Sequence, residues 1–130
     1  MIITNNVRRS VALIFFLSFF QIVFSQLNYD TSKISAFNEV TVSFTNKRGL
    51  KDASGNVYYV EEDKKTLTAY ESNKIKWQIN IIEACGDPGV GAPEIRHLKI
   101  NKDKIEVTFG KHTFASVNTK DGKTRCLGSD

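Results

Sequence analysis

The stretch from Val57 to Ile82 constrains the fold more than any other part of the chain. Its 26 residues contain three candidate strands separated by two polar turns. The first two, V-Y-Y-V and T-L-T-A-Y, are rich in the β-branched and aromatic residues that favour strands. In the third, four apolar residues alternate with polar ones: Ile75, Trp77, Ile79 and Ile81. This period of two predicts a strand with one buried face, on which Trp77 lies in the core.

The first 25 residues have the composition of a signal peptide. Arg8 and Arg9 precede an apolar run from Val11 to Phe24, and the small residue Ser25 follows. The alternative is a membrane anchor, but a spanning helix needs about 20 apolar residues. This run has only 14 and contains polar interruptions. We therefore expect cleavage before Gln26, and no stable membrane anchor afterwards.

Removal of the leader changes the charge of the chain. The leader holds two of the 18 basic residues and none of the 14 acidic ones, so the net charge falls from +4 to +2. Basic and acidic side chains are interspersed along residues 26–130, without the basic stripe that nucleic-acid-binding proteins carry. We expect one domain over residues 26–130 and no nucleic-acid partner.

Cys85 and Cys126 are the only cysteines of the chain. Because an exported protein meets an oxidising environment, we expect them to form a disulfide. In the chain-entropy model, closing a loop of this length stabilises the fold by about 4 kcal/mol. Two free thiols or a two-ligand metal site are the alternatives, but His97 and His112 have no ligand spacing to the cysteines. No metal or cofactor is expected.

The rest of the chain also shows strand patterns. Between Phe37 and Thr45 three apolar residues alternate with polar ones and are expected on one buried side: Val40, Val42 and Phe44. The polar segment that follows is expected to hold a short pairing around Leu50. Beyond residue 93, four further strand candidates are separated by turns: I-R-H-L-K-I, I-E-V-T-F, T-F-A-S-V and K-T-R-C-L. No apolar 3.6-residue period persists for three turns, so the sequence predicts an all-β domain.

Two parts of the chain repeat the order strand, tight turn, strand, polar turn, strand. The first runs from Val57 to Trp77 and the second from Ile105 to Cys126. The segments L-T-A-Y-E-S-N-K-I-K-W and F-A-S-V-N-T-K-D-G-K resemble parts of a blade of the quinoprotein-type (PQQ-like) β-propellers. The matched positions are Leu67 with Phe114 and Tyr70 with Val117. A propeller closes with at least about four blades, and this chain holds two, so neither a ring nor its cofactor is implied.

What the propeller resemblance implies is four-stranded antiparallel sheets packed face to face. A second resemblance, of architecture alone, is to the periplasmic immunity proteins that protect bacteria from type VI secreted cell-wall amidases. Those proteins are also small, secreted and blade-like. The expected fold is therefore all-β: a small antiparallel sandwich, or two stacked propeller-blade-like sheets, stapled by one disulfide.

The sequence contains no recognisable catalytic motif. There is no G-x-S-x-G, and neither cysteine is adjacent to a histidine. The acidic residues of E-E-D-K-K, from Glu61 to Lys65, are followed by two lysines and indicate a solvated turn rather than paired catalytic carboxylates. We therefore expect no enzyme.

The segment from Glu83 to Pro93 holds three of the eight glycines and both prolines, so no regular element is expected to run through it. It lacks the Lys-Ser/Thr pair of a phosphate-binding loop. Two interpretations stay open: a crossover that joins two sheets, and a protruding recognition loop anchored at Cys85. In the second, the presented and rim side chains are Asp87, Val90, Glu94, Arg96 and His97.

The sequence is compatible with two functions. The first is a secreted or periplasmic protein-binding domain, such as an immunity or inhibitor protein of a secreted bacterial toxin, with a toxin or envelope protein as partner. The alternative is a carbohydrate- or cell-envelope-binding module. Exposed coplanar aromatic side chains would favour sugar binding, and adjacent Tyr58 and Tyr59 must point to opposite faces, which makes one of them a candidate. A loop that protrudes beyond the sheets would favour the inhibitor.

Overall fold

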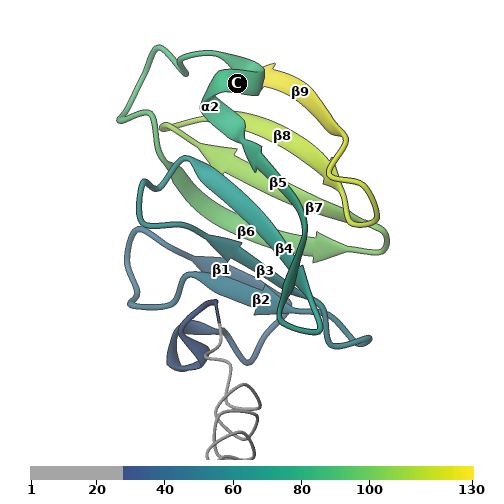
Figure 1. Ribbon diagram of the computed structural model, residues 1–130. Helices are drawn as coiled ribbons and strands as arrows, with labels where there is room; N and C mark the ends of the chain where they lie inside the picture. The colour runs from purple at the N-terminus through teal and green to yellow at the C-terminus, as the bar shows by residue number, and fades with distance from the viewer. Residues whose placement is uncertain (1–27) are drawn as a thin grey trace, which may run out of the picture.

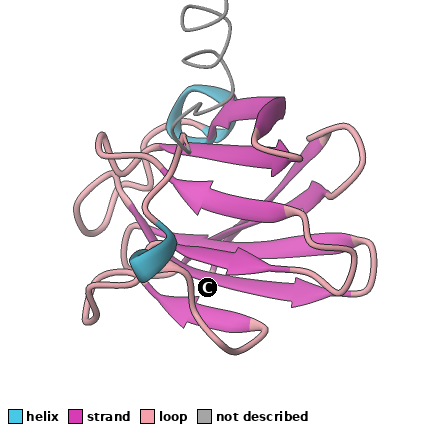
Figure 2. Cartoon of the chain, turned by 60° about the horizontal axis from the view of Figure 1, so that its bottom comes forward, coloured by secondary structure: helices cyan, strands magenta, loops and turns pink. Residues whose placement is uncertain are grey.

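Two antiparallel sheets pack face to face in the computed structural model, which describes residues 28–130 (Figure 1). The leader and its expected cleavage before Gln26 lie outside the described residues. Strands make up almost all of the regular structure; of the two short helical elements, one precedes the first strand and the other lies in a connection (Figure 2). The chain therefore forms the all-β sandwich that the sequence predicts.

The four-stranded sheet is a meander built around the stretch that organises the sequence. Its order is β2-β3-β4-β5, with every neighbouring pair antiparallel. The bounds are β2 Gly49–Lys51, β3 Val57–Val60, β4 Thr66–Glu71 and β5 Lys74–Asn80. The three strands expected between residues 57 and 82 and the pairing expected around Leu50 are thus confirmed.

A bulge in β5 changes the face of one predicted core residue. Ala69 pairs with Trp77, whereas Tyr70 pairs with Ile75, so one extra residue of β5 lies between the two pairs. Trp77 is buried in the core and Ile79 packs against it, but Ile75 is 57% exposed. The prediction for Trp77 is confirmed and the one for Ile75 is wrong, because a bulge shifts the alternation by one residue.

The five-stranded sheet has the order β1-β6-β7-β8-β9, again antiparallel throughout. Its bounds are β1 Glu39–Thr41, β6 Ile95–Asn101, β7 Lys104–Phe109, β8 Thr113–Asn118 and β9 Thr124–Ser129. Strand β1 is shorter than expected. Just beyond its end, the Val42 amide donates to the Arg96 carbonyl at 2.8 Å, after which the chain turns. Phe44 is consequently 79% exposed, and its predicted place in the core is wrong.

The core lies between the two sheets and draws on both. The Tyr58 ring stacks on Trp77, with ring centroids 6.0 Å apart. The other buried side chains of the cluster are aliphatic or aromatic: Val40, Val42, Leu50, Val60, Leu67, Ala69, Ile81, Ile95, Leu98, Ile105, Val107, Phe109, Ala115 and Val117. Burial of this apolar surface is the main force that holds the sheets together.

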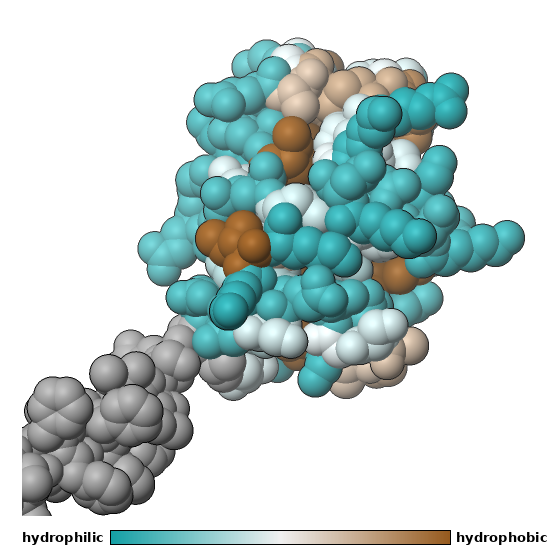
Figure 3. Space-filling view, turned by 45° about the vertical axis from the view of Figure 1, so that its right-hand side comes forward, coloured by the Kyte–Doolittle hydropathy of each residue, from teal (hydrophilic) through white to brown (hydrophobic). Residues whose placement is uncertain are grey.

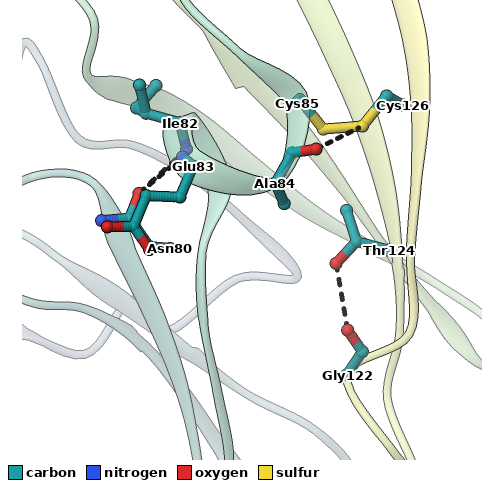
Figure 4. Close-up of a disulfide and its surroundings, with 8 residues drawn as sticks. All are labelled: Asn80, Ile82, Glu83, Ala84, Cys85, Gly122, Thr124 and Cys126. Carbon is teal, nitrogen blue, oxygen red and sulfur yellow. Dashed lines mark hydrogen bonds between the residues drawn. A yellow bond between two sulfur atoms is a disulfide. The ribbon is translucent and has the colours of Figure 1, made fainter.

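The disulfide between Cys85 and Cys126 closes one side of the sandwich, as predicted, with a Cα–Cα distance of 5.6 Å. It joins β9 to α2, a single helical turn over Ile81–Cys85 (Figure 4). The helix begins because the Asn80 side chain accepts hydrogen bonds from the backbone amides of Ile82 and Glu83. Ile81 is buried, as expected, but as the first residue of this helix rather than as part of β5.

A second, smaller apolar cluster covers the outer face of the four-stranded sheet. The Tyr29 ring lies 6.1 Å from the Tyr59 ring and 5.0 Å from the Tyr70 ring, between centroids. The segment continues as η1, a 3-10 turn over Thr31–Lys33, which Asp30 caps through the Ser32 amide. Tyr59 is therefore buried on the face opposite Tyr58, and the expectation that one of this pair is exposed is wrong.

The internal repeat is present in strand order but not in side-chain direction. Strands β3 to β5 and β7 to β9 are each three consecutive strands of a meander. Leu67 and Val117 lie in the core, whereas Tyr70 belongs to the outer cluster and Phe114 lines the outer face of the five-stranded sheet. Each matched pair thus combines an inward residue with an outward one.

Candidate functional site

Residues 86–94 connect α2, at the end of the four-stranded sheet, to β6 in the other sheet. The segment is therefore a crossover between sheets. It also extends beyond the ends of the strands (Figure 1). The expectation that Glu83–Pro93 has no regular structure is wrong for its first three residues, which Asn80 draws into a helical turn, and holds for the remainder.

Contacts with the β7–β8 turn hold this crossover loop in one conformation. The Lys111 amide donates to the Val90 carbonyl at 2.9 Å, and the Gly110 amide donates to the Glu94 carbonyl at 3.0 Å. Pro88 packs directly on Gly110, where an added Cβ would lie only 2.4 Å from the Pro88 Cβ. The loop is thus ordered by backbone hydrogen bonds to the β7–β8 turn and by close packing on a glycine at which any added Cβ would collide with Pro88.

Asp87 and Val90, two of the three predicted site residues on the loop, have different roles. Asp87 is exposed, but its carboxylate accepts a hydrogen bond from the Gly89 amide at 2.8 Å. It therefore shapes the loop. The Val90 side chain is 60% exposed. Val90 is an apolar side chain displayed on a fixed backbone.

Arg96 lies at the base of the loop and connects it to a residue that sequence reasoning placed elsewhere. Its Nη1 donates to the Gly110 carbonyl at 3.3 Å, and its guanidinium carbon lies 5.9 Å from the centroid of the Phe44 ring. Contacts thus run from exposed Phe44 through Arg96 and Gly110 to the backbone of Val90. The polar residues Ser43, Thr45 and Asn46 next to Phe44 indicate a turn. The alternation of Val40, Val42 and Phe44 instead suggests that the strand continues.

The remaining two predicted residues differ in position. The Glu94 carboxylate lies 4.0 Å from the Lys64 ammonium, an exposed ion pair that stabilises little. His97 lies on the outer face of the five-stranded sheet, where its ring contacts the Thr41 hydroxyl at 3.0 Å and the Glu39 carboxylate at 3.3 Å. The structure therefore brings four of the five residues together at the crossover and places His97 on a neighbouring face.

The outer face around His97 contains a shallow depression of about 440 Å³. Phe114 and Leu127 are its largest apolar side chains, and its charged side chains are Glu39, Lys99 and Glu106. All four tyrosines and the single tryptophan lie within the described residues, and none of them is exposed. The described residues therefore offer no exposed tyrosine or tryptophan as a stacking platform for a sugar.

The described residues contain no group of three or more His, Cys, Asp or Glu side chains placed to hold a metal ion. Nor does any helix in residues 28–130 combine the length and hydropathy needed to cross a bilayer. The disulfide is compatible with an exported protein.

Fold and site together define a disulfide-stapled antiparallel β-sandwich with a fixed inter-sheet loop. Comparison with protein-family models, with curated proteins and with solved structures finds no match.

Proposed function

We propose that this chain is an exported, non-catalytic domain that binds a protein partner through the crossover loop and its base. The observation that carries this proposal is the display of Val90 from a backbone that is already held by Lys111, Gly110 and Pro88. A loop ordered before binding loses little conformational entropy when a partner docks, so more of the contact energy appears as affinity.

The chemistry at the base of the loop suits a protein surface. Arginine and aromatic residues are enriched among the side chains that dominate protein–protein affinity. Arg96 and Phe44 supply both, in contact with each other, and Arg96 also donates to the carbonyl of Gly110, whose neighbour Lys111 holds the Val90 backbone. The face drawn in Figure 3 is mostly hydrophilic with small separate apolar patches, so that face offers no broad apolar interface.

An inhibitor or immunity protein is the kind of binder that these features support best. Pre-organised inhibitors dock with little backbone movement, which agrees with a loop that is anchored by hydrogen bonds and preceded by a disulfide-bonded helix. The partner would be a secreted toxin or an envelope protein, encountered in an oxidising compartment outside the cytoplasm. The carbohydrate-binding alternative has less support, because tyrosine and tryptophan side chains of the described residues are buried or half-buried.

The test compares two matched substitutions at opposite ends of the sandwich. Val90→Asp places a charge on the loop, and Ile75→Asp places one on an equally exposed β-branched residue of β5, since the two side chains are 60% and 57% exposed. Both variants should melt as the wild type does. Each immobilised protein is then used to capture partners from an envelope extract, and the affinity for the captured partner is measured.

We expect the wild type and Ile75→Asp to bind one partner with equal affinity, and Val90→Asp to bind it at least about tenfold more weakly, which is about 1.4 kcal/mol. Equal affinity of all three proteins would show that the loop serves architecture alone. Loss of binding in the Ile75 variant and not in the Val90 variant would move the contact to the other end of the molecule.

A further inference from the structure

A cavity of about 500 Å³ opens at the end of the sandwich opposite the crossover loop. Hairpin turns from both sheets converge on it, together with the first residues of β5. Four lysines lie in its lining: Lys51, Lys76, Lys102 and Lys120. Successive members of the four are 18 to 26 residues apart in the sequence, so the sequence shows no basic cluster. The cluster forms only when the fold brings the turns together.

One carboxylate, Asp52, also lines the cavity, but it is already engaged by its own turn. It accepts hydrogen bonds from the amides of Ser54 and Asn56 and, at 2.7 Å, from the Tyr58 hydroxyl. Burial raises the pKa of Asp52, but these hydrogen bonds outweigh that effect and hold the pKa below its usual value. Asp52 is therefore ionised at neutral pH, and the lining carries three net positive charges.

Most of these lysines have no internal counter-ion. Lys76 lies 3.8 Å from the Glu71 carboxylate, whereas Lys51, Lys102 and Lys120 make no ion pair within the part of the chain that the structure describes. Charges of one sign around a concave surface focus the electrostatic potential and raise the local concentration of the opposite ion. The arrangement thus favours an anion more than four isolated surface lysines would.

A second hollow shows that the basic lining is not a simple consequence of a lysine-rich chain. It measures about 610 Å³ and is lined by Asp30, Glu61, Glu62 and a single lysine, Lys33. Two concave regions of similar size therefore carry opposite signs. A smaller basic hollow of about 280 Å³, lined by Lys104, Lys123 and Arg125, lies at the same end, so positive charge gathers where hairpin turns from both sheets meet.

We propose that the lysine-lined cavity binds a polyanion that carries two or more phosphate or sulfate groups. Its volume exceeds what a single oxyanion fills and lies within the range of small-molecule sites. Lysine ammonium groups act as adaptable point charges towards phosphate. Uncharged donors complete the lining: Asn38, Ser54 and Asn56.

The floor of the cavity is closely packed and contains a spectroscopic reporter, Trp77. Tyr58 lines the cavity and stacks on Trp77, whose Nε1 donates to the carbonyl of Thr119, another lining residue, at 2.9 Å. Trp77 also packs on Gly122, where an added Cβ would lie 2.7 Å from the indole ring. Because Trp77 is the only tryptophan of the sequence, its fluorescence reports on this region alone.

The experiment compares two triple variants with the same net charge. The cavity variant is Lys51→Gln, Lys102→Asn and Lys120→Gln; the control, at the opposite end, is Lys64→Asn, Lys65→Gln and Lys111→Gln. Asparagine is used where the backbone is left-handed, with φ 58° at Lys102 and 62° at Lys64, because it tolerates that conformation. Oxidised purified protein is titrated with pyrophosphate, with inorganic phosphate as the single-oxyanion comparison, and with vesicles containing cardiolipin, whose headgroup carries two phosphates. Trp77 fluorescence and amide chemical shifts are followed.

We expect pyrophosphate or the vesicles to bind the wild type and the control equally, and the cavity variant at least tenfold more weakly, with shifts centred on residues 51–56 and 119–120. Binding of pyrophosphate identifies a soluble polyanion as the source, and binding of vesicles alone identifies a lipid headgroup. If both triple variants bound the probes equally weakly, net charge alone would explain the binding and the proposed site would be overturned. A wild type that bound neither pyrophosphate nor the vesicles would also overturn it. Val90→Asp should leave this binding unchanged, which separates it from the proposed protein contact.

Discussion

The two ends of the sandwich are built from the same strands but are connected in different ways. Both segments that change sheet, residues 42–48 and 86–94, lie at one end, which we call the crossover end. All connections at the other end, the lysine end, are hairpins within one sheet: residues 52–56, 72–73, 102–103 and 119–123. A crossover must travel from layer to layer, so it is long and needs its own anchors. Hairpins are short and leave space between the layers.

This difference in connection places different side chains on the two surfaces. At the crossover end, the exposed apolar residues Phe44 and Val90 lie on the two sheet-changing segments, and Lys64 is paired with Glu94. At the lysine end, three lysines that form no ion pair with any residue in 28–130 surround a cavity. One end thus suits a protein contact and the other suits an anion, although neither property follows from the net charge of the chain.

The largest effect should come from Trp77, which fills the core at the lysine end. Trp77→Ala should lower the free energy of unfolding by about 3–5 kcal/mol, because it removes a buried indole and leaves a cavity. Ile75→Ala, on the same strand but outside the core, should cost less than about 1 kcal/mol. Urea unfolding measures both. A Trp77 variant that melts within a degree of the wild type would show that the register of β5 differs by one residue.

At the crossover end, the stability of the fold should depend instead on the disulfide between Cys85 and Cys126. Replacing Cys85 and Cys126 by serine should lower the free energy of unfolding by about 2–4 kcal/mol, because the unfolded chain regains the entropy of an open loop. Mass spectrometry after alkylation without reductant should find neither cysteine labelled in the wild type. Labelling of both would contradict the bond.

A smaller loss of stability is expected from the turns on either side of β3, and it should differ between the two turns. Asp52→Asn should cost about 1–2 kcal/mol, since it disturbs four hydrogen bonds around a charged acceptor. Asp63→Asn, in the β3–β4 turn, should cost less, because Asp63 accepts three hydrogen bonds and is exposed. Chemical unfolding at neutral pH compares the two, and an equal cost would remove the distinction between the turns.

The carboxyl groups of Asp52 and Asp63 also predict that the protein loses stability at low pH. Burial raises the pKa of Asp63, as it does for Asp52, but hydrogen bonds from Thr66 and Lys65 outweigh it and hold the pKa below the usual value. A group with a lowered folded-state pKa stabilises the fold above its unfolded pKa and loses that contribution as the pH falls through the folded one. The unfolding free energy should therefore decline below about pH 4, and less steeply in the Asp52→Asn variant.

The smallest effect concerns two lysines in equivalent backbone conformations at opposite ends. Lys102→Asn and Lys64→Asn should each change the unfolding free energy by less than about 1 kcal/mol and should not lower it, because asparagine tolerates a left-handed backbone better than lysine does. Thermal melting of both variants tests this. A clear loss of stability at Lys102 alone would show that this lysine supports the fold rather than a ligand.

The sequence by itself determined the features that depend on residues close together in the chain. The alternation and turns between residues 57 and 82 place three strands of the four-stranded sheet, because strand period and turn chemistry are local properties. The pairing of Cys85 with Cys126 follows from an even count of two. The presented Val90 lies in a segment whose glycines and prolines already mark it as irregular.

Only the tertiary structure decided the features that depend on neighbours far along the chain. The bulge that exposes Ile75 arises from its pairing with Tyr70, and the turn that exposes Phe44 follows the hydrogen bond from Val42 to Arg96. Burial of Tyr59 requires the N-terminal segment to fold over a sheet face. The lysine-lined cavity combines residues from several turns and both sheets, so its charge exists only after the layers pack. A local sequence pattern determines which residues share a face of a strand. Packing between distant segments determines whether that face is buried, exposed or part of a cavity.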